Sequence, residues 1–322
     1  MTRMFTAGVA VCAAMLLSPL FAKDRTRSYD LGEESLEKVL STQLDTGGWS
    51  KAKLGKGPDG KWITNVGKTE ATIDNDATTS EIAYLIRYCA AHGAAERARA
   101  ALDRALDWLI AAQLPNGGWP QFPGREKGYW TEITFNDNAM VNVLRLLRDI
   151  SRGEGDCAIF PPARREECRR AVERGVDCIL KCQIRVDGKP TVWCQQHDRV
   201  TLEPCRARAY ELPSFCTMES ANIVLFLMEL EPTPEIEAAI QGAADWFRSV
   251  SRTPDGRWAR FYDFDEVKPF FCGRDGVMRR NLDEIEKERR TGYGWFNRKP
   301  EDVLKRLEKR AKKAERAKKK RK

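Results

Sequence analysis

Two short clusters of aspartate and asparagine contain the residue types that bind a hard cation. One is the Asp-Asn-Asp cluster at residues 74–76, and the other is the Asn-Asp-Asn cluster at residues 136–138. Carboxylate and amide oxygens are ligands that Ca²⁺ prefers in proteins. An aspartate or asparagine in front of a helix is, however, more often only the N-cap of that helix. The two clusters therefore indicate either a calcium site or a pair of helix caps.

Four arginines in the second half of the chain could bind or deprotonate an acidic molecule. Arg206 and Arg208 precede Tyr210, Arg260 lies in the segment Trp-Ala-Arg-Phe-Tyr, and Arg274 lies in the segment Gly-Arg-Asp-Gly. The glycines beside Arg274 allow a tight backbone that presents its side chain. Alternatively, Arg260 and Arg274 form surface ion pairs with nearby aspartates, and such pairs contribute little to stability.

His197 is the remaining residue with a chemically useful side chain. It lies in the segment Trp-Cys-Gln-Gln-His-Asp, and His92 is the only other histidine of the chain. His197 could be a metal ligand, a base or a hydrogen-bonded loop residue. We interpret it as a hydrogen-bonded loop residue.

The elements that must position these residues follow a repeat of about seventy residues. Tryptophans 49, 119, 193 and 258 are spaced 70, 74 and 65 residues apart, and three of them follow a glutamine, namely Gln43, Gln113 or Gln183. Glycine, proline, asparagine and aspartate between glutamine and tryptophan end a helix and turn the chain. Repeats of this length indicate stacked helical units.

The helical pattern of each unit is clear. Residues 98–112 carry apolar side chains at i, i+3 and i+4, which predicts an amphipathic helix. Further helices are expected at 77–91 and 139–150, and short strands at 191–193 and 257–262. Helix, turn loop and capped helix in repetition predict an all-α fold, an α/α toroid of helical hairpins. Its long loops would gather at one rim, where a binding cleft is expected.

Composition divides the chain into three parts. Arg3, an apolar stretch from Ala7 to Leu17 and the small residue Ala22 predict a signal peptide at 1–22, and therefore a secreted or periplasmic protein. A catalytic domain is expected at 23–304. The basic tail, 305–322, has 12 lysines and arginines against Glu308 and Glu315. We interpret it as a solvated helix end or arm, with binding of an anionic polymer or surface as the alternative.

The cysteines leave their pairing open. Nine cysteines follow the predicted signal peptide, and export permits disulfides, but the number is odd. A structural zinc site is not expected, because the chain has no Cys-x-x-Cys pair and only two histidines. We expect no membrane span, no nucleic-acid partner and a monomer.

Several long motifs, in order, resemble polysaccharide lyase family 10 pectate lyases. The resemblance extends from about Leu31 to Phe296, over most of the expected domain. The motifs that carry it are Thr-Ile-Asp-Asn-Asp-Ala-Thr at 72–78, Leu-Pro-Asn-Gly-Gly-Trp-Pro-Gln-Phe at 114–122, Ile-Thr-Phe-Asn-Asp-Asn-Ala-Met-Val-Asn at 133–142, Val-Trp-Cys-Gln-Gln-His-Asp at 192–198, Arg-Ala-Tyr-Glu-Leu-Pro at 208–213, Trp-Ala-Arg-Phe-Tyr at 258–262 and Gly-Arg-Asp-Gly-Val at 273–277.

The resemblance implies an (α/α)₃ barrel and a Ca²⁺-assisted lyase reaction on polygalacturonate, or pectin, with an arginine base. It implies that Asp74 and Asp137 lie at the calcium and the substrate carboxylate. It also implies that Arg274 is the catalytic arginine and that Arg208 and Arg260 bind substrate.

Two tryptophans complete the predicted substrate site. Trp119 lies in a loop with further aromatic residues and is expected to stack on a sugar face, and Trp193 is a second candidate. The alternative for each repeat tryptophan is that it only fills a corner of a helical hairpin.

The sequence departs from the family pattern in three places. Asp76 stands where the family usually has glycine, the segment before Trp258 is shorter, and the basic tail has no counterpart. Two other functions stay open at this point. One is a glycoside hydrolase that uses two carboxylates such as Asp137 and Glu211. The other is a pectin-binding protein without catalytic activity.

Overall fold

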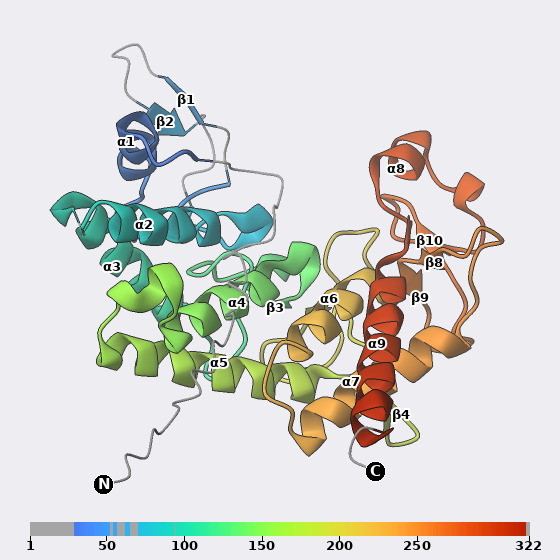
Figure 1. Ribbon diagram of the computed structural model, residues 1–322. Helices are drawn as coiled ribbons and strands as arrows, with labels where there is room; N and C mark the ends of the chain where they lie inside the picture. Colours follow the sequence, from blue (N-terminus) through green and yellow to red (C-terminus); the bar gives the residue numbers. More distant parts are fainter. Residues whose placement is uncertain (1–28, 52–53, 57–61, 65–69, 94, 320–322) are drawn as a thin grey trace, which may run out of the picture.

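Three helical hairpins form the body of the protein (Figure 1). The computed structural model describes residues 29–51, 54–56, 62–64, 70–93 and 95–319. The predicted signal peptide, 1–22, lies outside these residues. The hairpins pair α2 (Thr79–Ala91) with α3 (Glu96–Ala111), α4 (Ala139–Arg152) with α5 (Pro162–Cys182), and α6 (Thr217–Leu227) with α7 (Pro234–Ser249).

The hairpins are arranged as an inner and an outer set of helices. Helix α4 packs against both α2 and α6, whereas α5 packs against α7 on the outside. Helix α1 (Glu33–Ser41) covers α2 and α3, and α9 (Lys299–Lys319) covers α6 and α7. The short α8 (Lys287–Gly292) lies in the long C-terminal loop region. This arrangement confirms the predicted all-α fold of repeated hairpins.

The inner helices bring their starting segments together. Helix α2 follows the 3-10 turn η1 (Asp74–Asp76), and α4 follows η3 (Asn136–Asn138). The two turns pack on each other, and η3 also contacts α6. The clusters at 74–76 and 136–138, which begin 62 residues apart in sequence, therefore lie at one rim, as the repeat predicts.

A tryptophan secures each of the four repeats, and a glutamine does so in three of them. The side-chain amide of Gln113 donates to the carbonyls of Gly117, in its own loop, and of Ala171, in α5, both at 2.9 Å. Gln43 and Gln183 bridge their own loops to α3 and α7 in the same way. The loop also requires glycine, because a Cβ at Gly117 would lie 2.1 Å from the carbonyl oxygen of Arg174.

The tryptophan of each repeat is bonded back to the preceding helix. The indole N–H groups of Trp49, Trp119 and Trp258 donate at 2.9 Å to the carbonyls of residues 39, 109 and 247, and that of Trp193 donates at 2.7 Å to the carbonyl of Ile179. All four rings are buried. Large buried aromatic rings with a satisfied N–H are strong packing elements.

The strands are short and join loops to one another. The predicted strand region at 257–262 is confirmed as two strands that flank Arg260, but the one at 191–193 is wrong, because only Trp193 forms an isolated bridge, with Cys216. All described pairs are antiparallel: β1 (Leu54–Lys56) with β2 (Trp62–Thr64), β3 (Ile133–Thr134) with β6 (Gln196–His197), β4 (Arg185–Val186) with β5 (Lys189–Pro190), β7 (Phe215–Cys216) with β9 (Phe261–Tyr262), β8 (Trp258–Ala259) with β12 (Phe296–Asn297), and β10 (Phe271–Cys272) with β11 (Met278–Arg279).

The basic tail begins inside a regular helix. The expected boundary between residues 304 and 305 falls within α9, whose first half packs on the body through Val303, Leu304 and Leu307. Residues 308–319 are helical and exposed, and Arg310 pairs with Glu237 of α7. The tail is therefore a helical arm over these residues, and its binding of an anionic polymer or surface stays a prediction.

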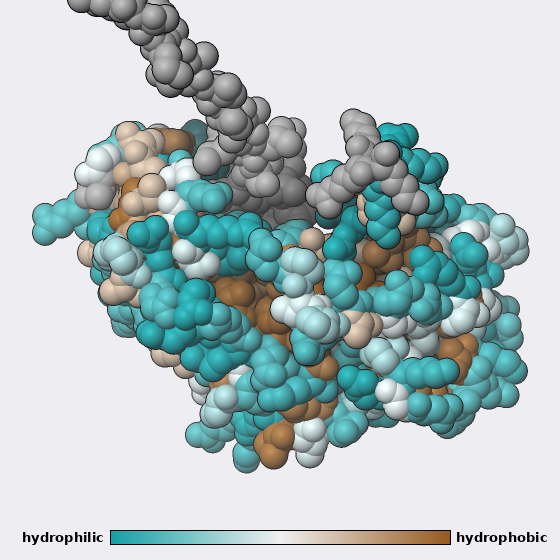
Figure 2. Space-filling model, turned by 60° about the horizontal axis from the view of Figure 1, so that its bottom comes forward, coloured by the Kyte–Doolittle hydropathy of each residue, from teal (hydrophilic) through white to brown (hydrophobic). Residues whose placement is uncertain are grey.

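The surface and the thiols add two further facts. Figure 2 shows a mostly hydrophilic face on which hydrophobic side chains appear in small groups. No helix within the described residues is long and apolar enough to cross a membrane. The nine cysteines after the predicted signal peptide carry free thiols, and all except Cys205 are buried.

The glutamine bridge makes a prediction for stability. Replacement of Gln113 by alanine leaves two carbonyls without their donor, and we expect the free energy of unfolding to fall by about 2 kcal/mol. Urea denaturation measures the loss. Gln241, an exposed glutamine of α7 that donates to Asp245, is the matched control, and its replacement should change stability by less than about 0.5 kcal/mol. Equal effects of both substitutions would contradict the structural role of Gln113.

Candidate active site

The two turns do not serve as helix caps. Helix α2 is capped by Thr78 in a capping box with Glu81, and no side-chain hydrogen bond caps α4. Instead, both turns contain consecutive residues with positive φ, which only special local structure imposes on side chains other than glycine. The cap interpretation of the two clusters is therefore wrong, and the turns present their oxygen atoms for another purpose.

Asp74 is a buried carboxylate with an unused oxygen. Its side chain pairs with Lys51 through Oδ2, and its backbone N–H donates to the hydroxyl of Thr72 at 3.1 Å. Oδ1 has no hydrogen-bond partner within the described residues. A buried carboxylate oxygen without a partner costs free energy, so Oδ1 is suited to accept a ligand.

Asp137 lies in the neighbouring turn in a strained backbone conformation. Its φ is +49°, and its Oδ2 accepts a hydrogen bond of 2.9 Å from the side chain of Asn136. The residue is accessible to solvent, yet protein surrounds it closely enough for desolvation to raise the pKa of its carboxyl group. Arg260 opposes this effect, whereas the negative charge of Asp74 adds to it. A carboxylate whose negative charge is disfavoured by a neighbouring carboxylate favours binding of a cation between the two.

Arg208 is a further charged residue within electrostatic reach of Asp137. It acts electrostatically on both Asp137 and Tyr129. Its Nε donates to Glu211 at 2.7 Å, and Glu211 also accepts a hydrogen bond of 2.8 Å from the hydroxyl of Tyr293. Burial lowers the pKa of Arg208, but the pairing with Glu211 outweighs it and raises the pKa. Its side chain remains 38% exposed, so it can reach a bound molecule.

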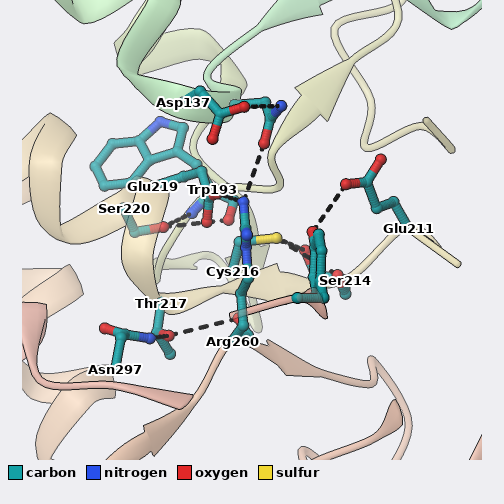
Figure 3. Close-up of polar contacts among 12 residues, drawn as sticks. Asp137, Trp193, Glu211, Ser214, Cys216, Thr217, Glu219, Ser220, Arg260 and Asn297 are labelled. Atoms are coloured by element: carbon teal, nitrogen blue, oxygen red, sulfur yellow. Dashed lines mark hydrogen bonds and ion pairs between the residues drawn. The ribbon is translucent and has the colours of Figure 1, made fainter. Parts of the chain in front are cut away.

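Arg260 is fixed in the wall of the site (Figure 3). It lies between β8 and β9, is 4% exposed, and pairs with Glu219 of α6. The same guanidinium nitrogen donates to the side-chain oxygen of Asn136 at 3.0 Å. Arg260 is therefore joined to Asp137 through one amide group.

Arg274 makes its contacts elsewhere. Its guanidinium pairs with Glu288 at 3.0 Å, its backbone N–H donates to Glu286, and its side chain is 61% exposed. Its loop packs on the segment that leads to Arg208, since the thiol of Cys272 donates to the carbonyl of Ala209. The structure thus brings together four predicted site residues, Asp74, Asp137, Arg208 and Arg260, whereas Arg274 pairs outside the cluster.

The expected stacking of Trp119 and Trp193 on a sugar is wrong. Both rings are 0% exposed and donate to backbone carbonyls of the preceding helices. Tyr129 and Trp130, in the loop after Trp119, are among the aromatic side chains in this region that stay partly accessible. Trp119 follows two glycines and packs into the core. The sequence pattern alone did not distinguish this buried position from one on the surface.

Calcium fits the donor set at the two turns. In the described part of the chain, no three side chains of histidine, cysteine, aspartate or glutamate are grouped to hold a metal. Ca²⁺ also takes amide, carbonyl, water and substrate oxygens, however, and needs six to eight in all. Asp74, with its unpartnered buried oxygen, and Asp137 would supply the charge, and Asn75 is the adjacent amide.

His197 has a structural role, as expected. It is fully buried, accepts a hydrogen bond of 3.1 Å from the backbone N–H of Cys194, and its other ring nitrogen lies 2.8 Å from the carbonyl of Leu202. Burial lowers the pKa of His197 to about 4. The neutral ring holds together the loop whose Gln195 carbonyl accepts the backbone N–H of Asn136.

Three residues of the site were missed by sequence reasoning. Lys51 follows the first repeat tryptophan, Tyr293 lies in the C-terminal loops, and Glu219 lies in the first turn of α6. A glutamate in that position is typical of a capping box, as Glu81 is in α2, so its type carries no signal of another role. Only the repeat alignment, which places α6 as the third inner helix, could have indicated Glu219.

Comparisons with known proteins agree on one family. The family model described as pectic acid lyase matches residues 43–255 and 250–304. The structure is similar to that of a family 10 polysaccharide lyase from Cellvibrio cellulosa, with a TM-score of 0.76, 33% identity, and coverage of 85% of this chain and 90% of that one. A mutant of that lyase in complex with trigalacturonic acid matches with a TM-score of 0.76, 32% identity, and coverage of 85% and 91%. No curated protein matches the chain.

The buried histidine predicts a specific loss of stability in acid. The pKa of His197 is about 4 in the fold and 6.5 ordinarily, so below pH 6.5 the unfolded chain binds a proton that the folded chain does not. Its contribution to stability is therefore complete above pH 6.5 and declines by about 3 kcal/mol as the pH falls to 4.

Urea denaturation at pH 7 and at pH 4.5 measures this decline. In the variant His197→Gln, which has no ring to titrate, we expect a lower stability at pH 7 and a smaller loss between the two pH values. His92→Gln, at an exposed histidine, is the control and should keep the pH dependence of the wild type. An unaltered pH dependence in His197→Gln would show that His197 is not the group responsible.

Proposed function

The chain belongs to the pectic acid lyase family, and we propose that it cleaves polygalacturonate by a calcium-dependent anti β-elimination with an arginine as the base. The protein is a polysaccharide lyase. The observation that carries the proposal is the meeting of two carboxylates, Asp74 and Asp137, with two arginines, Arg208 and Arg260, at the rim where the inner helices begin. The complex of the similar Cellvibrio cellulosa lyase with trigalacturonic acid supports the substrate class.

The acidic pair is suited to a divalent cation and an acidic sugar. When bound, Ca²⁺ would neutralise the uronate carboxylate and the second negative charge that develops next to it. Asp74 and Asp137 would hold the ion, and Lys51 and Arg208 lie around the pair to bind carboxylates of the substrate. A site that already contains these charges needs little reorganisation as the reaction proceeds.

Arg208 is better placed than Arg274 to remove the C5 proton. It lies beside Asp137, it is partly exposed, and its stacking contacts with Tyr210 and Tyr293 hold its guanidinium in place. Arg274 is paired with Glu288 outside the cluster, so we propose Arg208 as the base in place of the assignment that the resemblance implied. Arg260 is a positioning residue, because it is buried and bound to Glu219 and Asn136.

The reaction consists of one deprotonation and one bond cleavage. Neutral Arg208 takes the proton from C5, and the electron pair of the C–H bond forms the C4–C5 double bond. The bond between C4 and the glycosidic oxygen breaks, and that oxygen takes a proton from water. The pairing with Glu211 raises the pKa of Arg208, so the neutral base is scarce at neutral pH and the rate should increase toward alkaline pH.

Glu211 does not fit the role of the acid in a glycoside hydrolase mechanism. Such an enzyme needs one protonated carboxylic acid to act on the leaving oxygen. Glu211 is 1% exposed, and although burial raises its pKa, the hydrogen bonds from Arg208 and Tyr293 outweigh burial and lower it. Glu211 is therefore an anion bound to Arg208, not an acid.

The cellular location follows from the substrate and the first residues. We propose that the protein is secreted or periplasmic, because Arg3, the apolar stretch after it and Ala22 form a signal-peptide pattern. Polymeric polygalacturonate would be met outside the cytoplasm. We further propose that the exposed basic half of α9 contacts such anionic polymers.

A spectroscopic assay tests the reaction. Elimination makes a 4,5-unsaturated uronide that absorbs in the ultraviolet, whereas hydrolysis does not. We expect absorbance to increase with polygalacturonate and calcium, to stop after chelation with EDTA and to resume when calcium is restored. New reducing ends without ultraviolet absorbance would indicate hydrolysis and contradict the proposal.

The assignment of the base is tested by two arginine substitutions. Removal of a general base lowers the rate by about 10²- to 10⁴-fold, so the kcat of Arg208→Ala should be at least about 10²-fold lower than that of the wild type. Arg274→Ala is the comparison, and its kcat should stay within about tenfold of the wild type because its side chain pairs outside the cluster. The wild-type rate should increase from pH 7 toward pH ~10, where more arginine is neutral. A larger loss in Arg274→Ala than in Arg208→Ala would restore Arg274 as the base.

A further inference from the structure

We propose that Glu219 serves as the ion-pair partner of Arg260 in place of Asp137 and thereby keeps Asp137 available for a divalent cation. Glu219 is a positioning residue in this role, since it acts through Arg260 and not on the substrate. The inference rests on the proposed calcium-dependent function and adds a residue to that site.

Glu219 is buried in the first turn of α6 without a role in that helix. Its carboxylate is 1% exposed, Oε1 pairs with Arg260, and Oε2 has no hydrogen-bond partner within the described residues. The residue before α6, Cys216, forms no side-chain cap, so Glu219 is not part of a capping box as Glu81 is in α2. A buried carboxylate that does not cap its helix is retained for the partner that it binds.

Arg260 has two carboxylates within its electrostatic reach. Glu219 and Asp137 both raise its pKa, with burial acting in the opposite direction. The ring of Tyr293 lies 4.7 Å from the guanidinium, and its hydroxyl donates to Glu211 and does not bind Arg260. A guanidinium that is 4% exposed needs a counter-ion, because a buried unpaired charge is costly.

The connection to Asp137 passes through Asn136. Arg260 donates to Oδ1 of Asn136 at 3.0 Å, and the Nδ2 of the same amide donates to Asp137 at 2.9 Å (Figure 3). The amide therefore separates the arginine from Asp137. Because the same guanidinium nitrogen also pairs with Glu219, Arg260 has a counter-ion in Glu219 and reaches Asp137 only through the amide of Asn136, so the carboxylate of Asp137 stays available for a cation.

Loss of the charge at Glu219 should reverse this arrangement. Asp137 would then be the carboxylate left within reach of Arg260, and a direct ion pair between them would compete with a bound cation. Removal of Arg260 as well should abolish the competition, because no buried guanidinium then remains to pair with Asp137. Replacing a buried ion pair as a whole also often costs little stability. The two changes together should therefore restore what the first one removes.

Calcium titration of purified variants tests the inference directly. The test compares the wild type, Glu219→Gln and the double variant Glu219→Gln/Arg260→Met. For each protein, isothermal titration calorimetry without substrate gives the calcium dissociation constant, and a thermal melt gives the melting temperature. Glu219→Gln should bind calcium at least about tenfold more weakly than the wild type, which corresponds to about 1.4 kcal/mol. The double variant should return to within about threefold of the wild type.

A second glutamate on the same hairpin gives the matched control. Glu229, just after α6, is part-buried and pairs with Arg145 and Arg148 of α4, away from the turns. Glu229→Gln removes an acid–arginine interaction of similar kind, and calcium binding should stay within about threefold of the wild type. A tenfold loss in this control would overturn the inference, because the effect would then belong to general destabilisation.

Other outcomes of the calcium titration would also contradict the inference. The inference is wrong if Glu219→Gln binds calcium as the wild type does, or if the double variant binds as weakly as the single variant. If Glu219→Gln does not fold, the double variant still has to bind calcium near the wild-type affinity. A wild-type protein that binds no calcium without substrate overturns the role of Glu219, whereas the effect of EDTA on the ultraviolet assay decides the proposed function independently.

Discussion

The closeness of two carboxylates at one rim is the constraint on which the site depends. Asp74 and Asp137 come from turns that pack on each other, and the negative charge of Asp74 disfavours ionisation of Asp137. The fold tolerates this arrangement because Lys51 and Arg260 are built around the pair. Those cations are in turn restrained by other groups, since Glu219 pairs with Arg260. Negative charge is therefore concentrated on Asp74 and Asp137, while the charged groups around them are paired. This arrangement suits a small divalent cation.

The scaffold keeps this unfavourable charge arrangement in place. In each of three repeats a glutamine amide joins two carbonyls, one in its own loop and one in the second helix of the following hairpin, and in all four a tryptophan donates back to the preceding helix. The loops that carry the site are therefore attached at both ends to packed helices. Strain at residues with positive φ, such as Asp137, persists only in such a rigid frame.

The three candidate arginines differ in how deeply each is buried and in which groups it binds. Arg260 is enclosed and bound on both sides, so it orients its neighbours. Arg208 is held by Glu211 and by aromatic rings but stays partly exposed, which leaves it able to meet a substrate. Arg274 is an exposed partner of Glu288. Residue type made all three equivalent as candidates, and their different surroundings are the reason for proposing Arg208 as the base and Arg260 as a positioning residue.

The sequence alone determined the repeat, the hairpin fold and the oxygen-rich turns, because helix periodicity, glycine turns and local motifs are short-range properties. Tertiary structure decided which of the motif residues act together. Trp119 and Trp193 looked like surface residues until packing buried them, and Arg274 looked equivalent to Arg208 until its ion pair with Glu288 placed it outside the cluster. The role of Glu219 could be found only from its contact with Arg260, 41 residues away. Burial and charge pairing between distant segments are properties of the packed chain, and no spacing within one segment encodes them.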